Sequence, residues 1–350
     1  MTLTVGLVGA GPVAQAIHLP TLARLGGAVR VTEVMDPDVE LATAIAAQHG
    51  ARVSATLEEM LAAGGVDVAV VCSPNAFHVT QIEALAAAGV RGILAEKPLA
   101  MTHDEAARVA AAVTASGTAL VVGAMHTYDP AWLAAREALE SVAPLVEQGP
   151  FHVRSAVYLP SNARFEDMAT TMIRPAPRGG GGPAPSAADS LRGGVMGLAI
   201  HNLPLVRTAL PRLDEVGFAD SLDPWGYVIT ASGPQGSVDL LARMPGTWQP
   251  DWTLAFWGPQ VELHLAFTPS YVHSGSAVAR LRTADGSQRV FGPYPSDGYE
   301  AEWRELMAIL TDGATPRYGV QHLIDDVDYA IDLADLAVAA LDRSAAAVAR

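Results

Sequence analysis

Short apolar runs alternate with longer amphipathic segments over residues 1–123. The runs predict strands, namely Leu3 to Val8, Val29 to Met35, Val66 to Cys72, Gly92 to Ala95 and Leu120 to Gly123. The segments between them predict helices, namely Val13 to Leu25, Val39 to His49, His78 to Ala88 and Asp104 to Ser116. Continuous Val, Ile and Leu between helices indicates a parallel sheet covered on both faces. Right-handed crossovers make such a sheet doubly wound, so we expect an α/β domain over residues 1–123.

From residue 124 onward the pattern changes to longer extended segments. These are Phe151 to Leu159, Tyr227 to Ser232, Ser237 to Met244, Thr253 to Trp257, Gln260 to Ala266, Ala277 to Thr283 and Gln288 to Gly292. Turn pairs such as Gly233-Pro234 and Asp285-Gly286 separate them, which favours an open, mainly antiparallel sheet. Helices are predicted over Ala131 to Ser141, Tyr299 to Thr311 and Val320 to Leu341. We therefore expect residues 124–350 to form a second domain of the α+β class.

A Gly/Pro-rich stretch interrupts this second domain at residues 174–194. It contains glycines at 179 to 182 and prolines at 175, 177, 183 and 185. So many flexible and helix-breaking residues predict a flexible loop without a packed element. The loop is either a surface insertion or a lid over a neighbouring site, because long structureless loops inside compact domains are often functional.

Composition narrows the classes of function. The formal net charge is −15, which argues against nucleic acid because the phosphates would be repelled. The single cysteine, Cys72, excludes an intrachain disulfide and is interpreted as a small buried residue. No apolar run approaches the roughly 18 residues that cross a bilayer, and the amino terminus lacks the features of a signal peptide. We expect a cytoplasmic protein that binds neither membranes nor nucleic acid.

The first predicted strand runs directly into Gly9-x-Gly11-x-x-Ala14, which satisfies the dinucleotide-binding pattern of a Rossmann domain. The glycines allow a tight turn and the close approach of a pyrophosphate, which the N–H groups at the helix start, near Pro12 and Val13, would bind. Asp36 ends the second strand, where a carboxylate accepts hydrogen bonds from ribose hydroxyls and repels a 2′-phosphate. This favours NAD over NADP. The alternative is that Asp36 only forms a turn and caps the next helix.

Further polar residues follow the next two predicted strands. Ser73, Asn75 and His78 would face the same crevice and contact ribose or nicotinamide, although a helix cap explains Asn75 equally well. Glu96 and Lys97 end the fourth strand, where an ammonium costs free energy unless it is partnered. Because ligands bind at the carboxyl ends of such strands, Lys97, the chain's only lysine, is a candidate site residue.

Together these motifs resemble the Gfo/Idh/MocA family of oxidoreductases. The resemblance spans nearly the whole chain and is carried by residues 9–14, 73–78, 95–100, 123–131 and 200–203, most specifically by Glu96-Lys97-Pro98. It implies an N-terminal Rossmann domain and a C-terminal open sheet that often mediates dimers, hence a homodimer or homotetramer. It also implies that Lys97 reaches the substrate hydroxyl and the nicotinamide ribose, and that His201 is the catalytic histidine.

The resemblance thus implies an NAD(P)-dependent dehydrogenase or reductase acting on CH–OH groups of a sugar, cyclic polyol or sugar-derived metabolite. A neutral His201 would take the hydroxyl proton as hydride leaves the same carbon, since the ordinary pKa of imidazole, about 6.5, lies close to working pH. Lys97 would orient the oxygen and stabilise its developing charge without a metal. His126, Tyr128 and Arg164 are further candidates for binding the substrate.

The chain departs from the family pattern beside this histidine. The family helix carries an aspartate four residues before it and another polar residue three after it, where this chain has Gly197 and Pro204. Either Lys97 and His201 act without that carboxylate, or another acid such as Asp189 replaces it, or the reaction is a less usual one. Two alternatives follow: a redox-neutral enzyme that uses tightly bound NAD for elimination, epimerisation or glycoside cleavage, and a non-catalytic ligand-binding homologue.

For several other side chains, the sequence does not decide between a packing role and a functional role. Tyr158, Tyr271 and His273 are weaker candidates for hydrogen bonds to sugar hydroxyls. His18 is interpreted as structural, because it lies within the helix after the glycine-rich turn. The tryptophans, including Trp248, Trp252 and Trp257, are expected in the core or a subunit interface.

Overall fold

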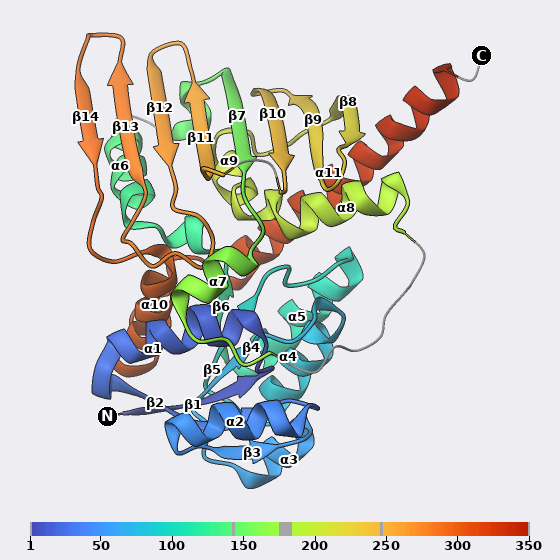
Figure 1. The fold of residues 1–350 in the computed structure, drawn as a ribbon. Coiled ribbons are helices and arrows are strands. Elements are labelled where there is room, and N and C mark those ends of the chain that lie inside the picture. The colour runs from blue at the N-terminus through green and yellow to red at the C-terminus, as the bar shows by residue number, and fades with distance from the viewer. Residues whose placement is uncertain (1, 142–143, 175–183, 246–247, 349–350) are drawn as a thin grey trace. The chain divides into compact units, whose positions relative to one another are not determined.

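The computed structural model describes residues 2–141, 144–174, 184–245 and 248–348, and Figure 1 shows their ribbon. The chain divides into two compact units. The first unit consists of Met1–Gly123, Phe165–Gly181 and Tyr299–Val327, and the second of Ala124–Arg164, Gly182–Gly298 and Asp328–Arg350. The domain boundary after residue 123 stays a prediction, and the first unit also includes two segments from the later part of the chain.

A six-stranded parallel sheet in the order β3-β2-β1-β4-β5-β6 forms the centre of the first unit. Its strands are β1 (Leu3–Val8), β2 (Val29–Met35), β3 (Arg52–Ser54), β4 (Val68–Val71), β5 (Gly92–Glu96) and β6 (Ala119–Gly123). The helices between them are α1 (Leu19–Leu25), α2 (Val39–His49), α3 (Leu57–Ala63), α4 (His78–Ala87) and α5 (His103–Ser116). Strands are added outward from β1 in both directions, so the predicted doubly wound Rossmann sheet is confirmed.

Strand β3 was not predicted from the sequence. It is short, and two of its three residues are exposed, so no apolar run marks it. Its place in the sheet is explained by the buried side chain of Glu33 on β2, whose carboxylate accepts hydrogen bonds from the Arg52 guanidinium (2.7 Å) and the Ser54 hydroxyl (2.6 Å).

Helix α3 was also missed, although its start carries a recognisable signal. The Thr56 hydroxyl accepts a hydrogen bond from the Glu59 N–H (3.2 Å), and the Glu59 carboxylate accepts one from the Ala55 N–H (2.8 Å). Thr followed three residues later by Glu is the sequence mark of such a reciprocal cap.

Two helical segments complete the first unit around its sheet. A π-helical turn, Ala14–His18, leads directly into α1, within the single helix predicted there. Helix α10 (Gly298–Asp312) packs on β5 at Gly92, where a Cβ atom would lie only 2.7 Å from Leu310 Cδ1. The Arg91 guanidinium donates a hydrogen bond to the Leu310 carbonyl at 2.9 Å.

The second unit contains an eight-stranded sheet in the order β14-β13-β12-β11-β7-β10-β9-β8. Only β7 and β10 pair in parallel, so the predicted mainly antiparallel sheet is confirmed. The strands are β7 (Phe151–Tyr158), β8 (Glu215–Ser221), β9 (Gly226–Gly233), β10 (Gly236–Arg243), β11 (Asp251–Trp257), β12 (Val261–Ala266), β13 (Val278–Thr283) and β14 (Gln288–Phe291). The sequence did not reveal β8, because a register shift between Val216 and Phe218 interrupts its alternation.

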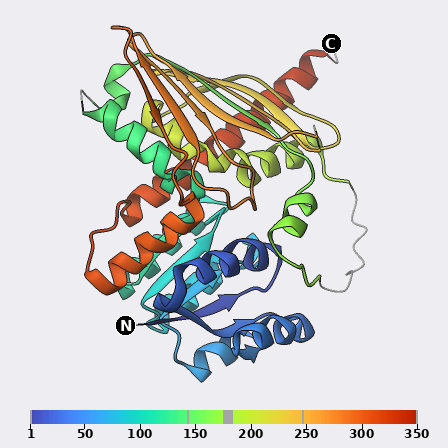
Figure 2. The ribbon, with the colours of Figure 1, turned by 60° about the vertical axis from the view of Figure 1, so that its left-hand side comes forward.

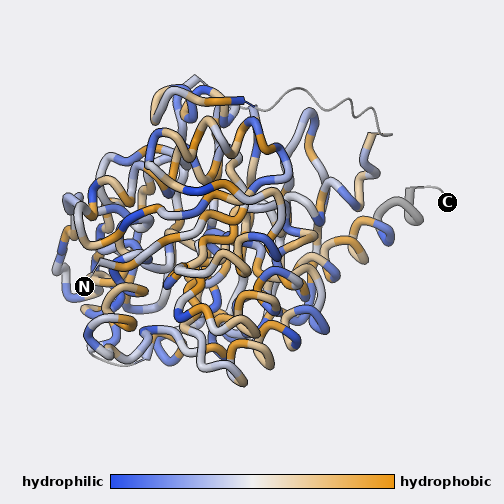
Figure 3. Tube along the Cα trace, turned by 90° about the horizontal axis from the view of Figure 1, so that it is seen from below, coloured by the Kyte–Doolittle hydropathy of each residue, from blue (hydrophilic) through white to orange (hydrophobic). Residues whose placement is uncertain are grey.

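Helices cover one side of this sheet, as Figure 2 shows. Helix α6 (Pro130–Glu140) packs on β13 and β14, and α8 (Ala187–Gly197) packs on β8 and β9. Helix α9 (Leu203–Ala209) also belongs to this unit, whereas α7 (Ala163–Ala169) and α11 (Val320–Val348) each cross the boundary between the two units along the chain. Hydrophobic and hydrophilic residues alternate along α11 in Figure 3, as expected of a helix with one buried face.

The predicted loop at 174–194 needs a correction. Residues 175–183 lie outside the described residues, but helix α8 begins at Ala187, so the prediction of no packed element was wrong for residues 187–194. A capping box starts this helix. The Ser186 hydroxyl accepts a hydrogen bond from the Asp189 N–H (3.1 Å), and the Asp189 carboxylate accepts one from the Ser186 N–H (3.3 Å). These local bonds outweigh the helix-breaking neighbours.

Gly9 and Gly11 should differ in their effect on stability. Gly9 has a φ of +100°, and a Cβ atom there would lie 2.9 Å from the backbone of Cys72 and Ser73, whereas a Cβ at Gly11 would meet nothing within 4 Å. We expect Gly9→Ala to lower the free energy of unfolding by about 1–3 kcal/mol, and Gly11→Ala to change it by less than about 1 kcal/mol. Urea unfolding of the full chain measures both, and equal losses would contradict the assignment.

Candidate functional site

The glycine-rich turn after β1 is fixed to the end of β2 by backbone and carboxylate hydrogen bonds. The Gly9 N–H donates to the Met35 carbonyl at 2.8 Å. The Asp36 carboxylate accepts from the Ala10 N–H at 2.9 Å and from the Asp38 N–H at 2.8 Å. Asp36 therefore both shapes this turn and presents its negative charge beside it.

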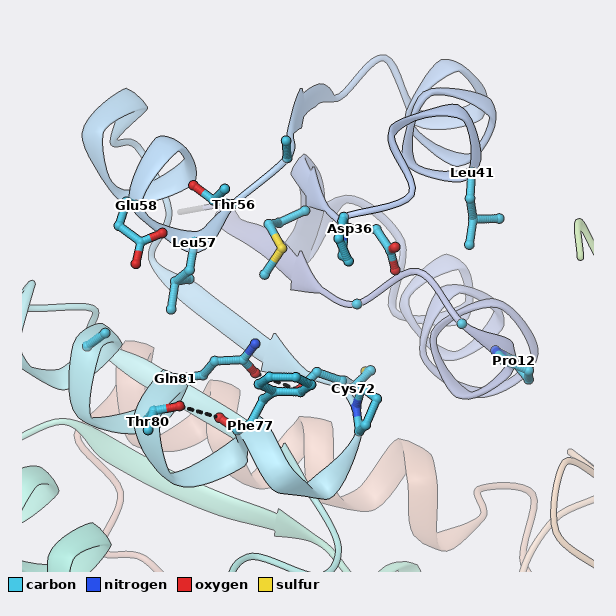
Figure 4. Close-up of a pocket in the computed structure, with 18 residues that line it drawn as sticks. Pro12, Asp36, Leu41, Thr56, Leu57, Glu58, Cys72, Phe77, Thr80 and Gln81 are labelled. Atoms are coloured by element: carbon cyan, nitrogen blue, oxygen red, sulfur yellow. Dashed lines mark hydrogen bonds between the residues drawn. The ribbon is translucent and has the colours of Figure 1, made fainter. Parts of the chain in front are cut away.

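A cavity of about 960 Å³ opens at this end of the sheet. Figure 4 shows Glu58, Thr56 and Leu57 on one side of it, Pro12 and Leu41 on the other, and Asp36 between them. Five of the predicted cofactor residues line it, namely Gly9, Gly11, Pro12, Asp36 and Ser73. The other five do not, namely Val13, Asn75, His78, Glu96 and Lys97.

Apolar side chains that the sequence did not single out form much of the cavity wall. Leu41 comes from α2, Leu57 from the start of α3, and Phe77 from the turn before α4. Phe77 is 54% exposed, so its ring is accessible to a ligand in the cavity. Its place inside the polar run from Ser73 to His78 was the available signal.

The residues that line the cavity have the chemistry that a dinucleotide requires. Its walls offer apolar surface for a flat ring, Asp36 offers a carboxylate for hydroxyl groups, and the open space around Gly11 leaves its backbone approachable. Glu58 adds a second acidic side chain to the wall.

His78 and Asn75 lie beside this cavity rather than in its lining. The buried His78 ring places Nε2 2.8 Å from the Ser73 carbonyl and Nδ1 2.8 Å from the Pro98 carbonyl. It thereby joins the loop after β4 to the loop after β5. Asn75 is exposed, and its amide donates to Met101 Sδ at 3.3 Å.

Glu96 and Lys97 lie at the end of β5. The Glu96 carboxylate is buried, accepts a hydrogen bond from the Lys97 N–H (3.3 Å) and lies 3.0 Å from His18 Nε2. Lys97 is half-buried, and burial lowers the pKa of its ammonium group, while the Glu96 carboxylate opposes that shift. Lys97 thus follows directly after β5, at the strand end where the sequence predicted a positively charged side chain.

In the second unit, two predicted residues meet in a buried group that we call the histidine cluster: His126, His201, Asn202, Trp252 and Phe267. His126 stacks on Phe267 with ring centroids 3.7 Å apart. The ring of Trp252 contacts His126 and His201 edge-on, at centroid distances of 4.6 and 5.3 Å. The two histidine rings themselves are 5.8 Å apart.

Hydrogen bonds assign the tautomer of His126. The Asn202 amide donates to the Ser155 hydroxyl at 2.8 Å, which leaves the Asn202 carbonyl oxygen 2.7 Å from His126 Nδ1. Nδ1 therefore carries the proton and donates it, so that Nε2 is an acceptor. Burial lowers the pKa of His126 to about 3, although the Asn202 hydrogen bond acts in the opposite direction. The ring is neutral at ordinary pH.

The remaining residues of the second unit that the sequence suggested for substrate binding are not members of the histidine cluster. Tyr128 is buried near the start of α6. Arg164 is exposed and donates to the Trp248 carbonyl at 2.6 Å, so it is not part of the histidine cluster. His273 lies 3.1 Å from the buried Asp297 carboxylate. Tyr158 at the end of β7 and Tyr271 are half-buried.

No carboxylate occupies the position four residues before His201, because Gly197 ends α8 there. Asp189 lies at the opposite end of the same helix, about 12 Å away along its axis. Its carboxylate is exposed, and hydrogen bonds from Ser186 lower its pKa. Within this helix, Asp189 serves as a cap.

The described ranges contain neither a metal-binding cluster nor a membrane-spanning helix. No group of three or more His, Cys, Asp or Glu side chains in those ranges is arranged to hold a metal ion. None of the helices there is long and apolar enough to cross a membrane.

In a comparison with known proteins, the part of the chain that forms the parallel sheet of the first unit matches a known family. Residues 3–124 match the Gfo/Idh/MocA profile, described as an oxidoreductase family with an NAD-binding Rossmann fold. Inositol 2-dehydrogenase 1 of Saccharopolyspora erythraea is 37% identical over 144 residues. That match covers 40% of this chain and 42% of that protein.

Solved structures resemble nearly the whole chain at lower identity. A 3-ketoreductase from Actinomadura kijaniata in complex with NADP and TDP-benzene has a TM-score of 0.70 at 17% identity, covering 95% of this chain and 96% of its own. A dehydrogenase from Bordetella pertussis in complex with NADH and UDP-GlcNAcA has a TM-score of 0.71 at 17% identity, covering 96% and 95%. At these identities the likeness shows the fold, with its Rossmann sheet and second mixed sheet.

The buried neutral His126 predicts a pH dependence of stability. The unfolded chain takes up a proton near pH 6.5 and the folded chain only near pH 3, so acid favours unfolding between these values. The free energy of unfolding should fall with decreasing pH by up to about 1.4 kcal/mol per unit from this group. Urea unfolding at several pH values should show a shallower slope for His126→Asn, whose amide replaces the Nδ1 donor without titrating.

His152→Asn provides the matched control, because His152 is an exposed histidine on β7 of the same unit. Its slope should equal that of the unaltered protein. A His126→Asn slope that is also unchanged would show that His126 does not carry this dependence.

Proposed function

Because the chain belongs, through residues 3–124, to the Gfo/Idh/MocA oxidoreductase family, we propose that it is a nicotinamide-dependent oxidoreductase. It transfers a hydride between the cofactor and a secondary alcohol or ketone of a sugar, cyclic polyol or sugar-derived metabolite. The observation that carries the proposal is the cavity at the carboxyl ends of the Rossmann strands, lined by Gly9, Gly11 and Asp36.

NAD is the proposed cofactor in preference to NADP. The Asp36 carboxylate beside the glycine-rich turn suits ribose hydroxyls and repels a 2′-phosphate. Glu58 in the same cavity wall adds to that repulsion. When bound, the nicotinamide ring supplies the site to which a hydride is transferred.

The chain's own residues position the substrate and move a proton. Lys97 orients the reacting oxygen and stabilises negative charge on it, which suits an ammonium at a strand end. His201 takes the hydroxyl proton in the oxidative direction. His126, whose Nε2 is an acceptor, receives a hydrogen bond from a second hydroxyl in this proposal.

A polyol substrate is supported by the relatives. A protein of Saccharopolyspora erythraea that is 37% identical over 144 residues is named an inositol 2-dehydrogenase. Cyclic polyols present several adjacent hydroxyl groups, and the acceptor nitrogen of the neutral His126 ring suits such a donor. We further propose that the protein forms homodimers or homotetramers, which light scattering after gel filtration tests.

Lys97→Met tests the proposed reaction. The variant keeps an unbranched apolar side chain and removes the charge, so hydride transfer should fall about 100-fold or more while NAD affinity changes little. Reduction of NAD is followed by absorbance with myo-inositol and a panel of related polyols and sugars. A variant as active as the unaltered protein would overturn the assigned role.

The same assay distinguishes the proposed oxidoreductase from the redox-neutral alternative, in which NAD stays bound to the enzyme. Substrate turnover without added NAD and without net NADH would indicate transient oxidation on a retained cofactor. Ligand binding without turnover over the whole panel would indicate a non-catalytic homologue.

Asp36→Ser tests the cofactor preference. Removing the carboxylate removes the repulsion of a 2′-phosphate, so the ratio of NADP to NAD affinity should rise about tenfold or more. Asp38→Ser is the matched control, because Asp38 carries the same charge two residues away, caps α2 through the Leu41 N–H (3.1 Å) and does not line the cavity. Equal ratios in both variants would overturn the role of Asp36. Calorimetric titration with each dinucleotide gives the ratio.

A further inference from the structure

A chain of buried polar groups crosses the first unit from helix α10 to the end of β5. The indole Nε1 of Trp303 lies 3.2 Å from His18 Nδ1, and His18 Nε2 lies 3.0 Å from Glu96 Oε1. The other carboxylate oxygen, Glu96 Oε2, accepts from the Lys97 N–H at 3.3 Å. We call this series the polar chain. It links three elements that are distant in sequence.

The direction of each hydrogen bond in the polar chain follows from its first member. An indole N–H only donates, so His18 Nδ1 must be an acceptor. The proton of the neutral ring is then on Nε2, which donates it to the Glu96 carboxylate. Trp303 thereby selects the tautomer of His18 that holds the carboxylate. The two rings meet edge-on, with centroids 6.1 Å apart.

The residues of the polar chain are buried, which raises the free-energy cost of losing one of their hydrogen bonds. His18 and Trp303 are completely buried, and Glu96 is 8% exposed. A buried carboxylate without hydrogen-bond donors is costly, so the His18 N–H is essential to its position. The absence of a side chain at Gly123 gives it room, because a Cβ atom there would lie 2.9 Å from Glu96 Oε1.

Two further titratable groups lie in this region. They are the Cys72 thiol after β4 and the buried Glu302 carboxylate on α10. Burial and the charges of Glu96 and Glu302 raise the pKa of Cys72 well above its ordinary value, so the thiol stays protonated. Glu96 is thus the acidic group adjoining Lys97, and Cys72 adds no charge to the region.

We propose that His18, oriented by Trp303, is a positioning residue that fixes the Glu96 carboxylate beside Lys97. The proposal rests on the role proposed above for Lys97, because it explains how that ammonium is held ready. His18 is not among the residues that line the cavity. It acts through Glu96.

The electrostatic consequence concerns the charge of Lys97. Burial lowers the pKa of Lys97 and the Glu96 carboxylate counteracts this. If the His18 donor is removed, the Glu96 carboxylate loses the hydrogen bond that holds it and turns away from its present position. Lys97 then loses this negative neighbour, and its pKa falls further.

The test uses the fact that Lys97 is the only lysine of the chain. Lysine labelled with ¹³C at Cε gives a single side-chain signal, whose NMR titration reports Lys97 without substrate or cofactor. In His18→Phe the titration midpoint should move to lower pH. His18→Gln, whose amide keeps an N–H for Glu96, should restore most of it, and Trp303→Phe should give a smaller shift in the same direction.

Thr21→Val is the matched control. Thr21 is completely buried on α1, and its hydroxyl bonds within the helix to the Ile17 carbonyl at 2.8 Å. Its loss should leave the Lys97 titration unchanged. If His18→Phe fails to fold, Gly123→Ala carries the test, because it displaces the Glu96 carboxylate directly and should shift the midpoint in the same direction.

Activity provides the second measurement. In His18→Phe and Gly123→Ala, kcat should fall about 10- to 100-fold, and the pH profile of kcat should move with the Lys97 titration, while NAD affinity stays unchanged. An unchanged Lys97 titration in folded His18→Phe, or in Gly123→Ala, overturns the inference. Full activity of Lys97→Met would instead overturn the catalytic role proposed for Lys97, and the NMR titration would still show whether His18 positions Glu96.

Discussion

The first unit depends on the close approach of two backbones at Gly9. The Cα of this residue faces the backbone of Cys72 and Ser73 so closely that no side chain fits between them. Hydrogen bonds from the Gly9 N–H to the Met35 carbonyl and from the Cys72 N–H to the Val8 carbonyl, both 2.8 Å, hold the ends of three neighbouring strands together. The cavity opens where these strands end, and Gly9 and Gly11 line it together with the side chains of neighbouring elements.

Much of the fold was predictable because apolar periodicity is a local property. Long runs such as β1 and β2 carry enough Val and Leu to be recognised, and the glycine-rich turn between a strand and a helix marks the site. Strand β3 and helix α3 lack that density, so Leu57 and Glu58 were not foreseen in the cavity wall. Prolines and glycines around residues 174–194 concealed the start of α8, where hydrogen bonds between Ser186 and Asp189 decide the outcome.

In the second unit, the sequence did not show which distant residues come together. His126 and His201 are far apart along the chain, and they come together through side chains of β7, β11 and the segment after β12. Nothing at Phe267 or Trp252 distinguished those residues from ordinary core. Their rings remove water from His126, and that loss of solvation sets its charge state. Arg164 had the right chemistry, but it bonds the Trp248 carbonyl elsewhere on the surface of this unit.

The missing side chain at Gly123 has an evolutionary consequence. A methyl group there and the carboxylate at position 96 claim the same volume, and the imidazole at position 18 keeps that carboxylate from yielding it. The three positions therefore cannot drift independently. A lineage that fills position 123 must first give up the buried acid, and a lineage that gives up the acid no longer needs a histidine in the first helix.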